Sequence, residues 1–272
     1  MRKLLLLCCL LGLMAPAAHA ENKVLMMATT TSTNDTGLLD DMAPLLLKET
    51  GIELRWTSVG TGKALEMGKN CDVDVLLVHS PAAEAKFVEA GSGIERTQLM
   101  YNDFVIVGPV SDPAKVKGKN VAETLAAIAA GKLPFISRGD SSGTHNAEVA
   151  LWKGVGMSEM DKQEWYVSAG QGMLRTLAIA GEKGGYTVTD RGTWNKYEST
   201  LKEPATLQII TEGDSKLFNQ YSAIAVNPAQ CPKAKVELAR AFTKWMASPA
   251  TQKYIGAYKL NGKPLFTPNA GK

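Results

Sequence analysis

An apolar strand, a turn rich in hydroxyl side chains and glycine, and then a helix follow one another repeatedly along this chain. The first instance is the apolar stretch Lys23–Ala28, which leads into the hydroxyl-rich run Thr29–Gly37 and then into a helical pattern that starts at Leu38. A second instance lies in the middle of the chain, over Leu133–His145. Alternating strands and helices are typical of an α/β fold with mostly parallel sheets. Ligands of such folds bind beyond the carboxyl ends of the strands, where these turns are expected to lie.

The central turn combines a positive charge with the start of a helix. Arg138 directly follows the predicted strand, and Ser142, Gly143 and Thr144 are expected in the first turn of a helix that runs towards Gly154. The free backbone N–H groups of a first helical turn and the helix dipole both attract anions. An arginine adds a planar set of donors that suits an oxyanion, and the two hydroxyl groups add further donors. The loop therefore predicts an anion site.

Two other interpretations of this loop are open. The loop would also serve as an ordinary helix cap, since serine and threonine are favoured there, although a cap alone does not require an arginine beside it. The stretch Gly139–Gly143 resembles the loop around the nucleophile of trypsin-like proteases, so a secreted serine hydrolase is an alternative from a different class. Its candidate residues are Ser141 or Ser142 as the nucleophile and His79 or His145 as the base. The helix expected after the loop argues against that all-β fold.

Two further turns offer candidate donors to an anion. Thr30, Thr31 and Ser32 follow the first strand, so their hydroxyl groups are expected at the same kind of sheet edge as the central loop. Thr61 lies in Gly60–Lys63, directly after the strand predicted over Gly51–Val59. That stretch lacks the glycine and the hydroxyl residue at the positions that a nucleotide-binding P-loop requires, so only a small anion is expected there.

His79 stands at the end of the strand predicted over Val73–Val78. It either faces the site or is a buried structural histidine, and the sequence alone favours neither. The chain has three histidines in all, and one of them, His19, belongs to the predicted leader. A histidine-based metal site is therefore not expected, and no motif indicates another cofactor.

The first twenty residues predict a secretory signal peptide. Arg2 and Lys3 precede the apolar run Leu4–Met14, and the stretch Ala18–Ala20 has the pattern of a cleavage site. The apolar run is too short to span a membrane. Without the two leader charges, Lys+Arg falls from 30 to 28 against 27 acidic residues. This balance argues against nucleic acid or a membrane surface as the partner, and we expect a soluble exported protein.

Two cysteines remain after the predicted cleavage, Cys71 and Cys231. Export to an oxidising compartment and the even count fit a disulfide, but two buried free thiols are the open alternative. A bridge between such distant positions would stabilise the fold by roughly 4–5 kcal/mol in the chain-entropy model.

Five segments together resemble the tungstate-binding family among the periplasmic substrate-binding proteins of ABC importers, and the similarity spans nearly the whole mature chain. The segments are Ala28–Thr33, Ser58–Gly62, Asp72–His79, Ser137–His145 and Gly185–Gly192. The resemblance implies a two-lobed type II binding-protein fold of the α/β class with the ligand in the cleft between the lobes. Residues 21–107 and 221–272 would form the first lobe, and residues 108–220 the second. Both cysteines would then lie in the first lobe, which favours the disulfide.

The resemblance also implies a ligand class. The protein would capture a tetrahedral oxyanion, tungstate first and molybdate next, and deliver it to the membrane permease subunits of the importer. Phosphate-binding relatives share the spacing of Arg138 and Ser142–Thr144 but have an aspartate where His79 aligns. A carboxylate would repel a fully deprotonated dianion, whereas an imidazole can donate to it, so His79 favours tungstate, molybdate or sulfate. A phosphate- or sulfate-binding protein of the same fold stays an alternative.

The ligand set implied by the resemblance draws on both lobes. It comprises Thr30, Thr31, Ser32, Thr61, His79, Arg138, Ser142, Gly143, Thr144 and Thr187. We expect a monomeric periplasmic protein that has no enzymatic activity, no cofactor, no metal centre and no nucleic-acid partner.

Overall fold

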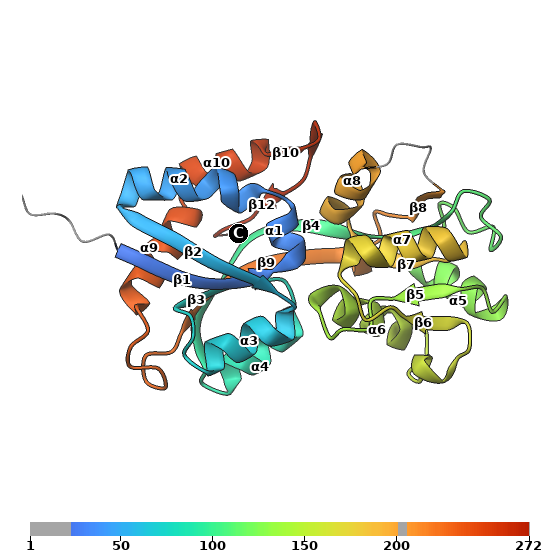
Figure 1. Cartoon of the computed structure of the whole chain (residues 1–272), viewed down its shortest axis with the longest axis horizontal. Coiled ribbons are helices and arrows are strands. Elements are labelled where there is room, and N and C mark those ends of the chain that lie inside the picture. The colour runs from blue at the N-terminus through green and yellow to red at the C-terminus, as the bar shows by residue number, and fades with distance from the viewer. Residues whose placement is uncertain (1–22, 201–205, 272) are drawn as a thin grey trace, which may run out of the picture.

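Two lobes lie side by side along the long axis of the molecule (Figure 1). The computed structural model describes residues 23–200 and 206–271, so the predicted signal peptide 1–20 lies outside the described residues. The arrangement confirms the two-lobed α/β fold that the sequence resemblance implied. None of the helices in the described ranges combines the length and the apolar character that crossing a membrane requires.

An eight-stranded sheet runs through both lobes in the order β12-β4-β9-β3-β1-β2, with β7 and β8 also paired to β4. Its strand β1 pairs in parallel with β2 and β3, but β9 pairs antiparallel with β3 and β4, and β7, β8 and β12 pair antiparallel with β4. The expectation of mostly parallel sheets is therefore wrong, because strands from late in the chain return antiparallel between and beside the earlier ones. The strands are β1 (Lys23–Thr30), β2 (Ile52–Val59), β3 (Val75–Val78), β4 (Gly93–Pro109), β5 (Phe135–Ser137), β6 (Tyr166–Ser168), β7 (Thr187–Asp190), β8 (Leu207–Thr211), β9 (Phe218–Val226), β10 (Lys259–Leu260), β11 (Lys263–Pro264) and β12 (Thr267–Pro268).

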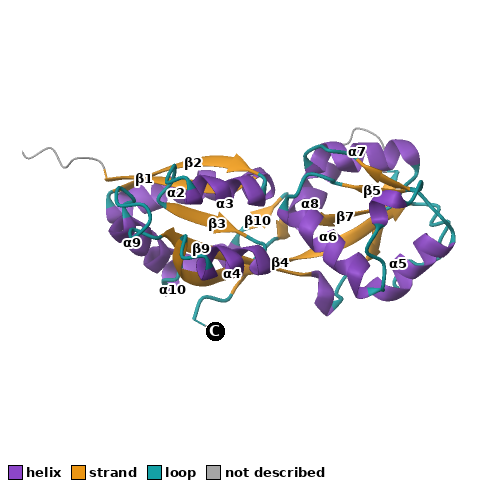
Figure 2. Ribbon diagram, turned by 90° about the horizontal axis from the view of Figure 1, so that it is seen from below, coloured by secondary structure: helices purple, strands orange, loops and turns teal. Residues whose placement is uncertain are grey.

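Helices cover both faces of the sheet in each lobe (Figure 2). In the first lobe, α2, α9 and α10 pack on one face, and α3 and α4 on the other. In the second lobe, α5 and α6 pack on one face, and α7 and α8 on the other. The helices are α1 (Thr31–Asp35), α2 (Leu38–Thr50), α3 (Thr61–Lys69), α4 (Pro81–Glu89), α5 (Val121–Ala130), α6 (Gly143–Gly154), α7 (Met173–Lys183), α8 (Arg191–Thr200), α9 (Val236–Met246) and α10 (Pro249–Ala257), with 3-10 turns at Met160–Lys162 and Ser215–Leu217.

The strand β4 is 17 residues long and belongs to both lobes. Its side chains Leu99 and Met100 pack into the core of the first lobe, whereas Phe104 and Ile106 pack into that of the second. Strand β9 lies antiparallel beside β4 and passes between the lobes with it (Figure 1). These two strands therefore connect the lobes. The predicted lobe boundaries, at residues 107/108 and 220/221, stay a prediction.

Three element ends differ from those that the sequence pattern predicts. Gly181 predicts the end of the helix that begins at Met173, but α7 continues to Lys183 and ends where Gly184 takes a left-handed conformation (φ 58°), which glycine adopts without strain. The pattern predicts a strand over Gly184–Trp194, but β7 ends at Asp190, whose carboxylate accepts hydrogen bonds from the Thr193 N–H and hydroxyl and so caps α8. Pro232 predicts the start of the terminal helix, but α9 begins at Val236.

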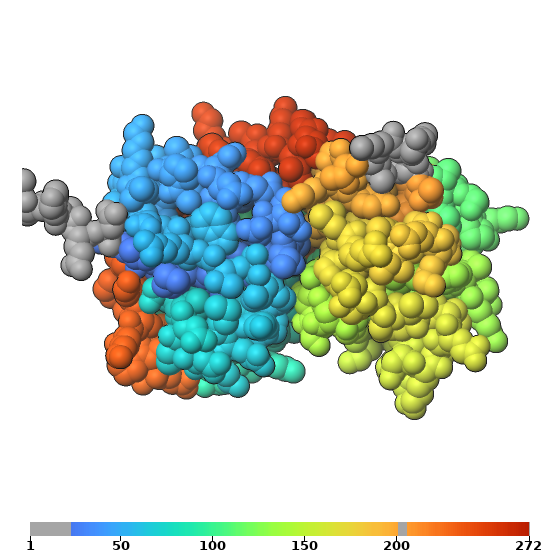
Figure 3. Space-filling view, in the orientation of Figure 1, coloured from blue at the N-terminus to red at the C-terminus, as the bar shows by residue number. Residues whose placement is uncertain are grey.

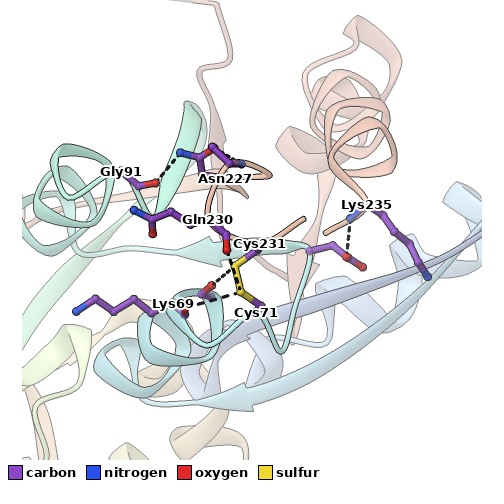
Figure 4. The surroundings of a disulfide bond; sticks show 10 residues. Lys69, Cys71, Gly91, Asn227, Gln230, Cys231 and Lys235 are labelled. Atoms are coloured by element: carbon purple, nitrogen blue, oxygen red, sulfur yellow. Dashed lines mark hydrogen bonds between the residues drawn. A yellow bond between two sulfur atoms is a disulfide. The ribbon is translucent and has the colours of Figure 1, made fainter. Parts of the chain in front are cut away.

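A disulfide joins Cys71 and Cys231, with 5.4 Å between their Cα atoms and a sequence separation of 160 (Figure 4). It links the end of α3 to the loop after β9 within the first lobe. The same loop is tied down by Asn227, whose side chain donates to the carbonyl oxygen of Gly91 at 2.6 Å. The predicted disulfide is thereby confirmed, and the alternative of two free thiols is excluded.

Candidate functional site

The loop before α6 is held rigid by its own side chains. Ser142 caps the helix, because its hydroxyl oxygen accepts a hydrogen bond from the backbone N–H of His145 at 3.2 Å. The Ser142 N–H donates to Asp140 Oδ1 at 3.1 Å, and Ser141 takes a left-handed conformation (φ 57°). The remaining N–H groups of the first turn of this 12-residue helix are therefore presented in a fixed direction.

Arg138 spans the boundary between the lobes. Its Nε donates to Asp140 Oδ2 at 2.9 Å, and its Nη2 donates to the hydroxyl oxygen of Thr31 at 3.2 Å. Only 4% of the side chain surface is exposed. Thr31 is the first residue of α1 in the first lobe, so the guanidinium group of the second lobe reaches across and is anchored there.

Helices α3 and α6 meet with their N-termini. A Cβ atom built on Gly143, the first residue of α6, would lie 2.9 Å from the Thr61 hydroxyl oxygen and 3.1 Å from His79 Cε1. A Cβ on Gly60, just before α3, would lie 3.9 Å from Ser142. In the space-filling view the two lobes are in direct contact (Figure 3). Two positive helix ends from different lobes therefore face one another.

Two buried hydroxyl groups in these first turns have no hydrogen-bond partner among the described residues. They belong to Thr61 in α3, which is fully buried, and to Thr144 in α6, which is 1% exposed. Burying a hydroxyl group without a partner costs free energy, and such groups are rare in folded proteins. An acceptor from outside the protein would satisfy them.

A network of hydroxyl groups surrounds the start of α1. The Thr30 hydroxyl oxygen accepts from the Thr33 N–H at 3.1 Å and lies 2.6 Å from the Thr33 hydroxyl and 3.2 Å from the Ser32 hydroxyl. His79 Nε2 lies 3.0 Å from both the Thr30 and the Ser32 oxygen atoms. All four side chains are buried. All of them except Thr33 are predicted ligand residues.

The hydrogen-bond partners of His79 fit one tautomer of its ring. Its Nδ1 lies 2.9 Å from Asn219 Oδ1, and because that oxygen can only accept, Nδ1 carries the proton. Burial lowers the pKa of His79 below its usual range, and Arg138 acts in the same direction, against the opposing effects of Asp190 and Asn219. The ring stacks on Tyr221, with 4.6 Å between the ring centroids.

Asn219 and Asp190 are two buried polar residues at the site that the sequence analysis did not select. Asp190 is fully buried, and both of its carboxylate oxygens accept hydrogen bonds from Thr193, at 2.9 and 2.6 Å. Asn219 and Gln220 are adjacent in β9, and the residues that follow them in this strand are mostly apolar. Two adjacent amide side chains in such a strand are the sequence signal that could have identified Asn219.

Strands β5 and β6, which hold Arg138 in place, are joined by the buried carboxyl group of Glu148. Its two oxygen atoms accept from the Ser137 hydroxyl at 2.7 Å and from the Tyr166 hydroxyl at 2.5 Å. Burial raises the pKa of Glu148 to about 7, although these hydrogen bonds oppose the shift. Glu148 in α6 thereby fixes the end of β5, directly before Arg138.

The structure brings nine of the ten predicted ligand residues together at the junction of the lobes. The tenth, Thr187, is buried at the start of β7, three residues before Asp190 and so roughly 10 Å from the strand end that faces this junction. Its role as a ligand stays a prediction, as does that of the other nine: Thr30, Thr31, Ser32, Thr61, His79, Arg138, Ser142, Gly143 and Thr144.

A surface cavity of about 740 Å³ lies elsewhere, beside β4 and β9, and is lined by Tyr101, Arg191, Phe218 and Phe266 among others. None of the predicted ligand residues lines it. Its walls carry no converging set of anion donors, so we do not place the functional site there. In the described part of the chain, no group of three or more His, Cys, Asp or Glu side chains is placed to hold a metal ion.

Comparison with known proteins yields a consistent set of relatives. The chain matches the model of the PBP superfamily domain over residues 16–250. It is 50% identical over 239 residues to the tungstate-binding protein TupA of Campylobacter jejuni, covering 88% of each chain, and 49% identical to TupA of Peptoclostridium acidaminophilum, covering 91% of this chain and 86% of the relative.

Solved structures agree with these sequence relatives. The tungstate-binding protein TupA from Desulfovibrio alaskensis G20 is 66% identical and superposes with a TM-score of 0.82, over 91% of this chain and 99% of that one. The structure described as the tungstate ABC transporter from Geobacter sulfurreducens is 44% identical, with a TM-score of 0.76, over 86% of this chain and 98% of that one. The chain therefore belongs to the PBP superfamily and, within it, to the family of the tungstate-binding proteins.

Proposed function

We propose that this protein is the periplasmic substrate-binding component of an ABC importer, that it captures tungstate, with molybdate as the second ligand, and that it delivers the anion to the membrane permease subunits. The observation that carries the proposal is a pair of buried hydroxyl groups, on Thr61 and Thr144, for which the described residues offer no partner, at two helix N-termini that face one another beside Arg138. The printed names of the relatives point to the same ligand.

A tetrahedral dianion between the lobes would satisfy donors from both of them. The guanidinium group of Arg138 supplies charge, and the first turns of α3 and α6 supply hydroxyl and backbone N–H donors. Hydrogen bonds to a charged group contribute roughly 1.5–3 kcal/mol each, more than neutral ones. Because the two half-sites belong to different lobes, binding favours the closed arrangement over any open one.

The site favours anions that carry no proton. Hydrogen phosphate brings an O–H group that needs an acceptor. The carboxylate and imidazole acceptors among the described residues at the junction already have protein donors: Asp140 accepts from Arg138 and Ser142, Asp190 accepts from Thr193, and His79 Nε2 lies within hydrogen-bond distance of the Thr30 and Ser32 hydroxyl groups. Tungstate, molybdate and sulfate need donors only, so they fit this set better than phosphate does.

Calorimetric titration of the mature protein with tungstate, molybdate, sulfate and phosphate tests the proposal. We expect tungstate and molybdate to bind most tightly and phosphate most weakly. At 100 times its dissociation constant a ligand adds about 2.7 kcal/mol to the stability, so thermal shifts should rank the four anions in the same order. Tighter binding of phosphate, or no binding of any of the four, would contradict the proposal.

We also propose that the protein is a monomeric binding protein without catalytic activity. Ser32, His79 and Asn219 are arranged like a nucleophile, a base and an orienting residue. However, Ser32 is 2% exposed and shares the imidazole with Thr30, so a substrate carbonyl group has no approach to it. The Ser142 hydroxyl oxygen caps α6 by accepting from the His145 backbone N–H. The His145 ring nitrogen Nδ1 accepts from the Ser141 backbone N–H. His145 is therefore not arranged as a base for the hydroxyl group of Ser141 or of Ser142.

The closeness of the two helix ends makes Gly143 a sharp test of closure. We expect Gly143→Ala to weaken tungstate binding at least about tenfold, because overpacking a tight contact costs roughly 1–3 kcal/mol. The added methyl group would meet Thr61 and the hydrogen-bonded ring of His79 only when the lobes are closed.

Gly154→Ala is the matched control for this substitution. Gly154 is the last residue of the same helix, and a Cβ there would meet nothing within 4 Å. We expect its affinity to equal that of the unmodified protein, as measured by calorimetry. Equal affinities for both alanine variants and the unmodified protein would show that Gly143 does not lie at a closing contact.

A further inference from the structure

A chain of hydrogen bonds runs from the inter-lobe strands to the hydroxyl groups of the site. Asn102 in β4 and Asn219 in β9 are cross-strand partners, and Asn219 Nδ2 donates to Asn102 Oδ1 at 2.7 Å. Asn219 Oδ1 accepts from His79 Nδ1 at 2.9 Å. His79 Nε2 then contacts the hydroxyl groups of Thr30 and Ser32, each at 3.0 Å. All members are buried, with at most 5% of the surface exposed.

The direction of this chain is set at its strand end. An amide oxygen can only accept, so Asn219 fixes the proton of His79 on Nδ1 and leaves Nε2 with a lone pair. That lone pair accepts a hydrogen bond from one hydroxyl group, of Thr30 or of Ser32. The Thr30 oxygen also contacts the Thr33 hydroxyl at 2.6 Å, so the arrangement that leaves a proton for an anion has Thr30 donating to Nε2, Thr33 donating to Thr30, and the Ser32 hydroxyl free to point at the ligand.

We propose that His79 is a positioning residue: its Nε2 accepts from the Thr30 hydroxyl group and so leaves the Ser32 hydroxyl group to donate to the ligand, and its Nδ1, through Asn219, ties that orientation to the strands that connect the lobes. The inference rests on the proposed anion-binding function and deepens it. It gives His79 a role behind the hydroxyl donors, in place of the direct donor role that the sequence resemblance suggested. It also explains why a buried amide pair lies on the strands between the lobes, where apolar packing would cost less.

Two substitutions of His79 separate this role from simple core packing. In His79→Gln the side-chain amide reaches the place of Nε2, and its oxygen can accept from the hydroxyl groups. In His79→Asn the amide reaches only the place of Nδ1, so the bond to Asn219 is kept and the acceptor is lost. We expect His79→Gln to keep tungstate affinity within about threefold and His79→Asn to lose at least about tenfold, since one oriented hydrogen bond to a charged ligand is worth about that factor or more.

A third substitution tests the link to the inter-lobe strands. Asn219→Leu removes the acceptor that fixes the tautomer, and we expect it to weaken binding about as much as His79→Asn. In the double variant the two losses should be clearly less than additive, because both act through the same hydroxyl pair. The matched control is Gln220→Leu, which removes the neighbouring buried amide whose Nε2 donates to the Met100 and Tyr221 carbonyl oxygens. Its affinity should stay that of the unmodified protein, even if its stability falls.

All variants are compared by calorimetry with tungstate, and their folding is checked by thermal melts. If His79→Gln and His79→Asn bind alike, or if the losses from Asn219→Leu and His79→Asn are additive, His79 does not position the hydroxyl groups and the inference is wrong. If the unmodified protein does not bind tungstate, the proposed function itself fails, so the two failures are distinguishable.

Discussion

Arg138→Ala is expected to reduce tungstate affinity at least about 100-fold, which corresponds to about 2.7 kcal/mol. The guanidinium group is the fixed positive charge at the junction of the lobes, and it is held there by Asp140 and Thr31. Its removal takes away charge-assisted donors and leaves the Asp140 carboxylate, without its cationic partner, close to the ligand. Truncating one member of such a buried charged contact costs roughly 2–5 kcal/mol.

Two further variants make the result specific. Arg138→Lys keeps the charge but not the planar set of donors, so its affinity should fall between that of the alanine variant and that of the unmodified protein. Arg240→Ala removes an exposed arginine of the first lobe, whose partners are Glu95 and Glu237, and should leave the affinity unchanged. Calorimetry on folded samples measures all three. Arg138→Ala with unchanged affinity would mean that the anion binds elsewhere.

Of the variants considered, Cys71→Ser is expected to lose the most stability. The chain-entropy model gives about 5 kcal/mol for a closed loop as long as the one between Cys71 and Cys231. The bridge to Cys231 spans 160 residues, which include the whole of the second lobe. For a chain of about 250 residues, a loss of that size lowers the melting temperature by roughly 10–20 °C. Calorimetric melts of the oxidised protein and of the variant measure the difference.

The reduced form of the unmodified protein is the control for this variant. Reduction should lower the melting temperature by about as much as the substitution does, and the double variant Cys71→Ser/Cys231→Ser should not differ from either. Tungstate affinity should be unchanged at temperatures where all forms are folded, because the bridge joins two segments of the first lobe away from the helix ends that form the site. A loss below about 1 kcal/mol would show that the bridge does not constrain the unfolded chain as the chain-entropy model assumes.

The local parts of the site could be predicted from the sequence, because each depends on a short stretch of chain. Arg138 and Ser142–Thr144 lie in one turn, and a strand followed by a capped helix is enough to place them. Thr30, Thr31 and Ser32 follow from the same pattern in the first turn. The resemblance to a known family supplied the two lobes and the ligand class. It also placed both cysteines in one lobe, which strengthened the disulfide predicted from their even number and from export.

What could not be predicted depends on contacts between distant segments. Asn219 reaches His79 over 140 residues of sequence, and nothing in its own strand indicates that partner. Strand β9 lies antiparallel between β3 and β4, and the direction of pairing is not encoded in its apolar pattern. Helix α8 was missed because its start, Arg191–Thr193, has no apolar periodicity and depends on the Asp190 cap.

The position of β9 in the sheet sets the order in which the two lobes can be completed. Because β9 lies between β3 and β4, the first lobe cannot join its early strands to the rest of its sheet until residue 226 is present. The helices and most strands of the second lobe lie between β4 and β9 in sequence. A chain that emerges from its N-terminus therefore holds all the helices of its second lobe before the sheet of its first lobe can be completed, and Cys231, the second partner of the disulfide, follows only after β9.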